Sequence, residues 1–176
     1  VVNRFIGHSD AVKVACFTSD GNSIVSGSKD KTIRLWNKNT GETLKTFKGH
    51  TNWVNSLDIS KDGSFIVSGS ADRSVRLWHI PSGVEIKKIE QGGSPVKAVA
   101  FSKDDNNNIL IGNTDHTVKL YIGKENKEWN LSLIISEKET ALTTQGTVVK
   151  GDCVELSEDN KKILENSEEI NNLLRA

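Results

Sequence analysis

The sequence predicts an all-β fold built from a repeated unit of four short antiparallel strands. Three observations carry this prediction. First, the stretch at positions 25–36 returns at 67–78 and, in altered form, at 110–121. Second, each copy has two alternating apolar runs on either side of a turn with Gly and Asp, which is the pattern of a β-hairpin. Third, 14 glycines and an apolar share of only 35% favour many turns and short strands.

The repeat has a constant period. Asp30 recurs as Asp72 after 42 positions and as Asp115 after 43, and the extra residue falls in the Asn-rich stretch 106–108. Each period contains four predicted strands separated by turns rich in Gly, Asp, Asn or Pro. A period of about 40–45 residues with four strands is typical of a propeller blade. The sequence therefore predicts a partial β-propeller of three four-stranded antiparallel blades, followed by a non-repeat C-terminal tail that is part helical.

The repeats divide the chain into five segments. We expect an orphan outer strand of another blade at 1–6, repeats at 7–48 and 49–90, a degenerate third repeat at 91–135, and the tail at 136–176. Alternation over 131–135 predicts the last strand of the third repeat, and 141–149 favours a further strand pair. Two interpretations of the later tail stay open. A capped apolar pattern predicts a helix over about 158–174, whereas alignment of 154–164 with 57–67 suggests a decayed fourth blade.

A Gly-His pair, a turn Asp and a closing Trp recur together at fixed spacing. The two clear copies run from Gly7-His8 to Trp36 and from Gly49-His50 to Trp78. Because the Gly-His pair, the turn Asp and the Trp occur together at this spacing, the chain resembles the WD-repeat β-propeller family over about residues 1–125. The third copy departs from the family pattern, because Gly92-Gly93 replaces Gly-His and Tyr121 replaces Trp.

The resemblance implies a buried hydrogen-bond network in each repeat. The matching positions are His8, Ser26, Asp30 and Trp36 in the first copy, His50, Ser68, Asp72 and Trp78 in the second, and Asp115 in the third. Ser, His and Asp also make up a nucleophilic triad. However, the set appears twice, one repeat apart, whereas an enzyme needs one site, so we expect a structural role, no catalytic residue and no enzyme activity. Ile111 replaces the Ser of the third copy, which predicts an incomplete network and a softer blade there.

The resemblance also implies a partner-binding face at the loops before the first strand and between the second and third strands. The candidates are Ala11, Lys13, Lys29, Trp53, Asn55, Ala71, Pro95, Lys97 and Thr114. Trp53 stands out because it adjoins inward-facing Val54, so that alternation directs it away from the core, and Trp is enriched in binding hot spots. The alternative is that Trp53 packs on a neighbouring loop. The three lysines favour an acidic partner segment, and the alternative for them is plain solvation.

Composition excludes several function classes. With 23 basic and 23 acidic residues, the net charge of 0 gives no long-range attraction to nucleic acid or an anionic membrane. The four histidines lack close ligand spacing and no Gly-rich phosphate loop precedes a helix, so we expect no metal and no cofactor. No apolar run is long enough to span a membrane. The two cysteines form no disulfide framework, and we expect Cys16 to lie in the core of a cytoplasmic protein, with the nucleus not excluded.

The sequence thus favours a non-enzymatic protein–protein interaction scaffold, with other proteins or peptide segments as partners. The absence of Met suggests a fragment of a larger propeller protein. The alternative is a sensor or regulatory propeller module of a larger enzyme or NTPase whose catalytic domain lies elsewhere. Because propellers typically have 4–8 blades, three blades also predict self-association or further blades that close the ring.

Overall fold

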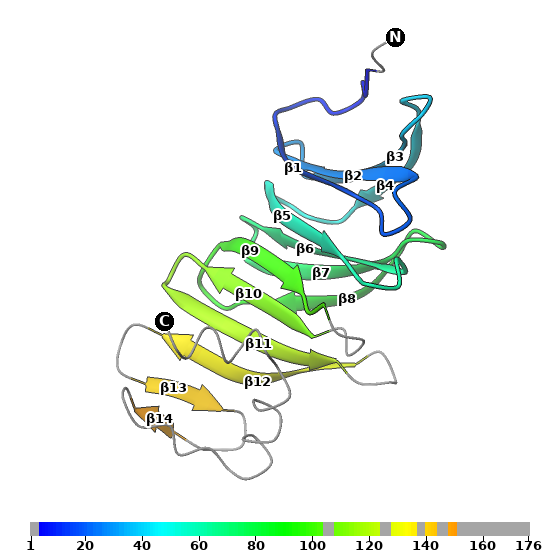
Figure 1. The fold of residues 1–176 in the computed structure, drawn as a ribbon. Coiled ribbons are helices and arrows are strands. Elements are labelled where there is room, and N and C mark those ends of the chain that lie inside the picture. Colours follow the sequence, from blue (N-terminus) through cyan, green and yellow to red (C-terminus); the bar gives the residue numbers. More distant parts are fainter. Residues whose placement is uncertain (1–3, 104–107, 124–127, 137–139, 144–147, 151–176) are drawn as a thin grey trace.

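The computed structural model describes residues 4–103, 108–123, 128–136, 140–143 and 148–150. Within these residues the chain forms three antiparallel sheets that follow one another in chain order (Figure 1). The first sheet contains β1 (Val12–Phe17), β2 (Ser23–Ser28), β3 (Thr32–Asn37) and β4 (Thr43–Lys48). The second contains β5 (Val54–Ile59), β6 (Phe65–Ser70), β7 (Ser74–His79) and β8 (Val84–Glu90). The third contains β9 (Val96–Phe101), β10 (Ile109–Asn113), β11 (Thr117–Gly123), β12 (Trp129–Ser136), β13 (Thr140–Thr143) and β14 (Val148–Lys150).

The four-stranded unit predicted from the repeat is present three times. In each sheet, consecutive strands pair as a meander, and β12 supplies the predicted fourth strand of the third unit. We call these units blade 1 (β1–β4), blade 2 (β5–β8) and blade 3 (β9–β12). Strands β13 and β14 form the further pair that the sequence favours at 141–149, and they extend blade 3 into a six-stranded sheet. The predicted helix at 158–174, or its fourth-blade alternative, lies outside the described residues.

Three-residue turns join the second and third strands of every blade. The backbone amide of Lys31 donates to the carbonyl of Ser28, and Lys31 itself has a φ of 70°. Arg73 and His116 occupy the same turn position, with φ values of 70° and 64°. A three-residue loop that ends on a left-handed residue is a common connection in β-hairpins. The same turn therefore recurs once per blade at the same edge of the sheets.

The blades pack face to face, with strands β1, β5 and β9 adjacent (Figure 1). Val25 and Phe47 of blade 1 join Val54 and Ile66 of blade 2 in one buried cluster, and blades 2 and 3 share a second cluster. Glycine at one position of the second strand permits this approach. A Cβ atom on Gly27 would lie 2.7 Å from Cγ1 of Val54, closer than carbon atoms tolerate.

In the described part of the chain, no blade covers the face of blade 1 that points away from blade 2, which we call the open face. Val12 and Phe17 are 53% and 63% exposed there. The equivalent residues one period later, Val54 and Ile59, are 0% and 8% exposed because blade 1 covers them. Both faces carry apolar residues at these two positions, but only that of blade 2 is covered by a neighbouring blade in the described part of the chain.

Residues 4–6 lie against this open face. They are not part of a strand, and residues 1–3 of the expected orphan strand lie outside the described residues. Phe5 contacts Trp36 edge-on with ring centroids 6.0 Å apart. One period later, Phe47 of β4 contacts Trp78 in the same manner at 5.8 Å. Phe5 thus occupies the place that an outer-strand residue of a preceding blade would take.

Candidate functional site

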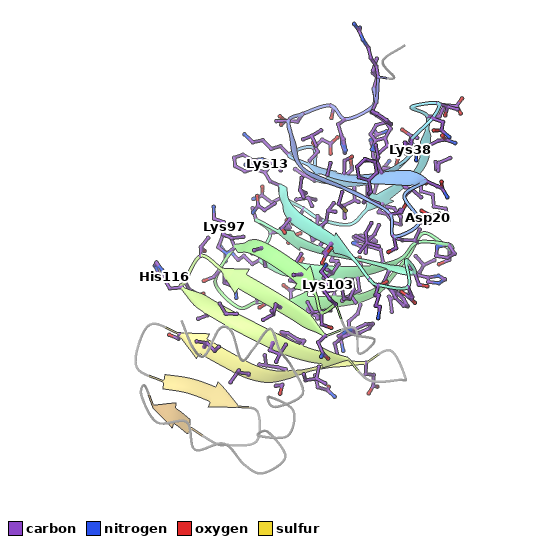
Figure 2. All side chains as sticks on the ribbon, in the orientation of Figure 1. Lys13, Asp20, Lys38, Lys97, Lys103 and His116 are labelled. Atoms are coloured by element: carbon purple, nitrogen blue, oxygen red, sulfur yellow. The ribbon has the colours of Figure 1, made fainter. Side chains whose placement is uncertain are left out.

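The candidate face lies at one edge of the sheets, which we call the loop edge. It consists of the loops before β1, β5 and β9 and the turns between the second and third strands, at residues 9–13, 29–31, 51–55, 71–73, 94–97 and 114–116. Figure 2 shows Lys13, Lys97 and His116 along this edge, with Lys38, Asp20 and Lys103 at the opposite edge.

One hydrogen bond joins the two parts of the loop edge in every blade. The amide of Lys29 donates to the carbonyl of Ala11 at 2.9 Å, and the amide of Ala71 donates to that of Trp53 at 2.9 Å. In blade 3, the amide of Thr114 donates to the carbonyl of Pro95 at 3.0 Å. The structure therefore brings six of the nine candidate face residues together as three bonded pairs.

A polar chain beneath the loop edge fixes its position in blade 1. The indole of Trp36 donates to Oγ of Ser26 at 2.8 Å, and that oxygen lies 2.7 Å from Nε2 of His8. The other ring nitrogen of His8, Nδ1, lies 2.7 Å from Oδ2 of Asp30. Asp30 in turn accepts from the amide and hydroxyl of Thr32 within its own turn. The chain thus ties the loop before β1 to strands β2 and β3.

Blade 2 repeats this chain with nearly the same distances. The indole of Trp78 lies 2.9 Å from Oγ of Ser68, which lies 2.8 Å from Nε2 of His50. Nδ1 of His50 lies 2.8 Å from Oδ2 of Asp72. Ser74 replaces the threonine of blade 1 and donates its amide and hydroxyl to Asp72. The four residues predicted for each of the first two repeats are thus in contact in both.

The donors of this chain fix two of its hydrogen bonds. The indole N–H of Trp78 only donates, so the Ser68 oxygen accepts from it. The Ser68 hydroxyl has two possible acceptors, Nε2 of His50 at 2.8 Å and the carbonyl of Arg76 at 3.4 Å. Nδ1 of His50 donates to the Asp72 carboxylate. Burial raises the pKa of Asp72, but hydrogen bonds from His50 and Ser74 outweigh it and hold the pKa well below the ordinary value.

Blade 3 uses a different polar set. Oδ1 of Asp115 accepts from the amide and hydroxyl of Thr117, but no histidine stands opposite it. Asn113 donates to the hydroxyl of Thr117 at 3.1 Å and to Oε1 of the buried Gln91 at 3.5 Å. Nε2 of Gln91 and Oδ1 of Asn113 are buried without a partner. Sequence reasoning missed these two residues because it set Gly92-Gly93 against Gly49-His50. The 42-residue step instead puts Gln91 at the position of Gly49 and Gly92 at that of His50, and Asn113 takes the position of Ser70.

The geometry of the polar chain does not suit catalysis. Ser68 is 0% exposed and the side chain of His50 is 1% exposed, so a substrate has no access to the hydroxyl. The same polar chain is present in blade 1, and in both blades a tryptophan N–H donates to the serine hydroxyl. Among the described residues, no group of three or more metal-binding side chains is placed to hold an ion. In the same part of the chain, no helix has the length and apolarity that membrane crossing requires.

Trp53 is an exposed aromatic side chain of the loop edge. It is 45% exposed, and the ammonium of Lys29 from the blade 1 turn lies 4.4 Å from its ring centroid. The ring is therefore partly open to solvent and also contacts a neighbouring turn. Asn55 differs from the other candidates because its side-chain amide donates to the carbonyl of Val96 and links blades 2 and 3.

Comparisons with known proteins agree with this architecture. The family model "WD domain, G-beta repeat" matches residues 1–37, 41–79 and 83–121. Over 46 residues, the chain is 37% identical to pre-mRNA-processing factor 17 of Homo sapiens and of Mus musculus, which covers 26% of this chain and 8% of those proteins.

Two solved structures share the fold. The structure of U3-55K has a TM-score of 0.69 at 21% identity, covering 78% of this chain and 42% of that one. The WD40 beta propeller domain of Doa1 has a TM-score of 0.62 at 27% identity, covering 68% of this chain and 39% of that one. This chain therefore spans about two fifths of each of these structures and a small part of the curated relatives.

Proposed function

Because this chain belongs to the WD domain, G-beta repeat family, we propose that it is a non-enzymatic scaffold that binds other proteins through its loop edge. Propellers of this family typically serve as protein-interaction modules. The observation that carries the proposal is the recurrent construction of the loop edge. Each blade presents the same loop and turn, bonded to each other by the same backbone hydrogen bond.

Rigidity of the loop edge supports a binding role. In blades 1 and 2, the polar chain anchors the loop before the first strand to the turn between the second and third strands. A surface held in one conformation loses little entropy when a partner binds. At the opposite edge, Asp20 and Asp62 accept hydrogen bonds within the turns between the first and second strands. The turns between the third and fourth strands differ there, with Asn39 in blade 1 where blade 2 has Pro81.

Site-specific photocrosslinking tests this proposal. A photoreactive phenylalanine analogue replaces Trp53 in one variant and exposed Ser82, at the opposite edge, in a second. The proposal predicts that a discrete protein adduct forms from the Trp53 position and not from the Ser82 position. Adducts at Ser82 alone, or equal adducts at both edges, would contradict binding through the loop edge.

The open face of blade 1 supports a second contact, with another blade of the same repeat. Val12 and Phe17 lie where the matching residues of blades 2 and 3 are buried, and Phe5 already takes the place of an outer-strand residue. An exposed apolar sheet face of this kind favours association. We expect the purified chain to self-associate through this face, and the Phe17→Glu variant to remain monomeric in light scattering. A parent chain that stays monomeric at high concentration would refute self-association.

A further inference from the structure

We propose that the loop edge takes an acidic protein segment that carries an apolar side chain, with Trp53 as the apolar anchor and the surrounding lysines as the charge partners. This inference rests on the proposed scaffold function and adds the chemistry of its partner.

The first observation is a set of cations without ion pairs. The loop edge carries five basic side chains, which are Lys13, Lys29, Lys31, Arg73 and Lys97. None of them forms an ion pair with a carboxylate in the described part of the chain. By contrast, Lys38 at the opposite edge donates to the carbonyl of Gly21, and Lys103 lies 3.7 Å from Asp58.

The carboxylates of the loop edge do not offset these cations for a ligand. The side chains of Asp30 and Asp72 are only 5% exposed, and both are saturated by histidine, hydroxyl and amide donors. Asp10 and Asp115 are exposed, but each accepts a backbone amide of its own loop or turn. Four exposed cations and the half-buried Lys29 therefore stand against two exposed carboxylates at the loop edge, although the whole chain has a net charge of 0.

The second observation is that Lys13 and Lys97 occupy equivalent positions on β1 and β9, the strands on either side of β5. Lys13, Asn55 and Lys97 are the second residues of β1, β5 and β9, and these strands are neighbours. Figure 2 shows Lys13 and Lys97 projecting from the same edge on either side of blade 2. A segment that crosses this row meets a cation on each side of the loop that carries Trp53.

The third observation is the state of Trp53 itself. Its ring is partly exposed and holds the Lys29 ammonium over its surface at 4.4 Å. The contact keeps both groups in one place without covering the ring. An incoming segment can then place a carboxylate against Lys29 and an apolar side chain against the exposed part of the ring. Tryptophan surrounded by polar rim residues is the common arrangement of a binding hot spot.

A protein segment fits these features better than a nucleic acid does. A protein surface that binds nucleic acid neutralises a run of phosphates and usually offers several aromatic rings on which bases stack. Here the described part of the loop edge has one exposed aromatic side chain, and acidic residues are interspersed among the cations. A peptide suits both features, because one of its side chains can supply a carboxylate for the lysines and another an apolar group for Trp53.

Fluorescence anisotropy with defined probes tests the inference. The probe is a short fluorescein-labelled peptide of glutamates around one leucine. Matched peptides carry glutamine for glutamate or alanine for leucine, and an oligouridylate serves as the RNA probe. We expect the glutamate–leucine peptide to bind the 176-residue chain at least about tenfold more tightly than either matched peptide, with an affinity that falls as salt rises.

Variants locate the binding. We expect W53A and the K13Q/K97Q double variant each to weaken binding about tenfold or more, while K103Q at the opposite edge changes it less than twofold. A thermal melt of each variant shows whether it has kept its fold. Absence of binding by the glutamate peptide, equal binding by the glutamine peptide, or tighter binding of the RNA that depends on the same residues would each overturn the inference. If the Trp53 crosslink persists in any of these cases, the scaffold proposal stands and only the acidic chemistry fails.

Discussion

Removal of the Asp72 carboxylate is the most informative perturbation of the polar chain. Its side chain is 5% exposed and accepts from the ring of His50, the amide of Thr51 and both donors of Ser74. In Asp72→Ala, the ring N–H of His50 and the donors of Ser74 lose their acceptor. Both residues are buried, so water does not replace the carboxylate.

The cost follows from the two buried residues, His50 and Ser74, whose donors lose their acceptor. Each residue contributes about 1–2 kcal/mol, which predicts a loss of about 2–4 kcal/mol in the free energy of unfolding. Asp115 is the matched control at the equivalent position of blade 3. It is exposed and has no histidine partner, so Asp115→Ala is expected to cost about 0.5–1 kcal/mol.

Urea unfolding followed by tryptophan fluorescence measures both variants, with the free energy extrapolated to water. The reasoning is refuted if Asp72→Ala unfolds within about 0.5 kcal/mol of the parent, or if Asp115→Ala costs as much as Asp72→Ala. The first result would mean that the polar chain of blade 2 does not stabilise the fold, and the second that the histidine partner and the burial of Asp72 do not set the cost.

Three further predictions concern acid stability, blade packing and thiol reactivity. Hydrogen bonds hold the pKa of Asp72 below its ordinary value in the folded state. The stabilisation by the Asp72 carboxylate is therefore complete above about pH 5 and declines as the pH falls below about 4. In urea titrations, the difference in unfolding free energy between the parent and Asp72→Ala should narrow below that pH. Gly27→Ala should cost about 1–3 kcal/mol because its Cβ would lie 2.7 Å from Val54, whereas Gly112→Ala at the same position of blade 3, with its nearest atom 3.6 Å away, should be neutral in thermal melts. Burial and, to a smaller extent, the nearby Asp58 raise the pKa of the Cys16 thiol to about 11. In a Cys153→Ser background, the folded protein should therefore react with iodoacetamide at pH 8 at least about tenfold more slowly than the protein unfolded in urea. Equal rates in the two states would contradict the burial of Cys16.

The periodic part of the fold was predictable because each repeat carries its own local signals. Alternation, the turn Asp and the 42-residue spacing fixed the four strands of each blade, and the structure contains them. The extension of blade 3 by β13 and β14 was only weakly marked, since short apolar stretches do not specify the edge on which they pair. The sequence also did not predict the contact of Phe5 with Trp36, because this contact depends on the path that residues 4–6 take across the open face of blade 1.

The sequence predicted where the residues of the candidate site lie along the blades, but it did not predict which residues they contact. The spacing placed Trp53 away from the core, but its contact with Lys29 joins two blades and depends on their relative placement. Asn55 looked equivalent to Lys13 and Lys97 in sequence, yet its shorter side chain bonds to the carbonyl of Val96. Gln91 and Asn113 were missed because they replace the histidine-based chain with residues that the repeat pattern does not contain.

Hydrogen–deuterium exchange on the complex with the protein captured at Trp53 tests the central claim most directly. The loop-edge account predicts that the partner slows exchange in peptides that contain residues 29–31, 51–55 and 71–73. Peptides that contain the opposite-edge turns at 18–22, 60–64 and 80–83 should exchange at the same rate with and without the partner. Protection of the opposite-edge turns, with the loop edge unchanged, would contradict the account.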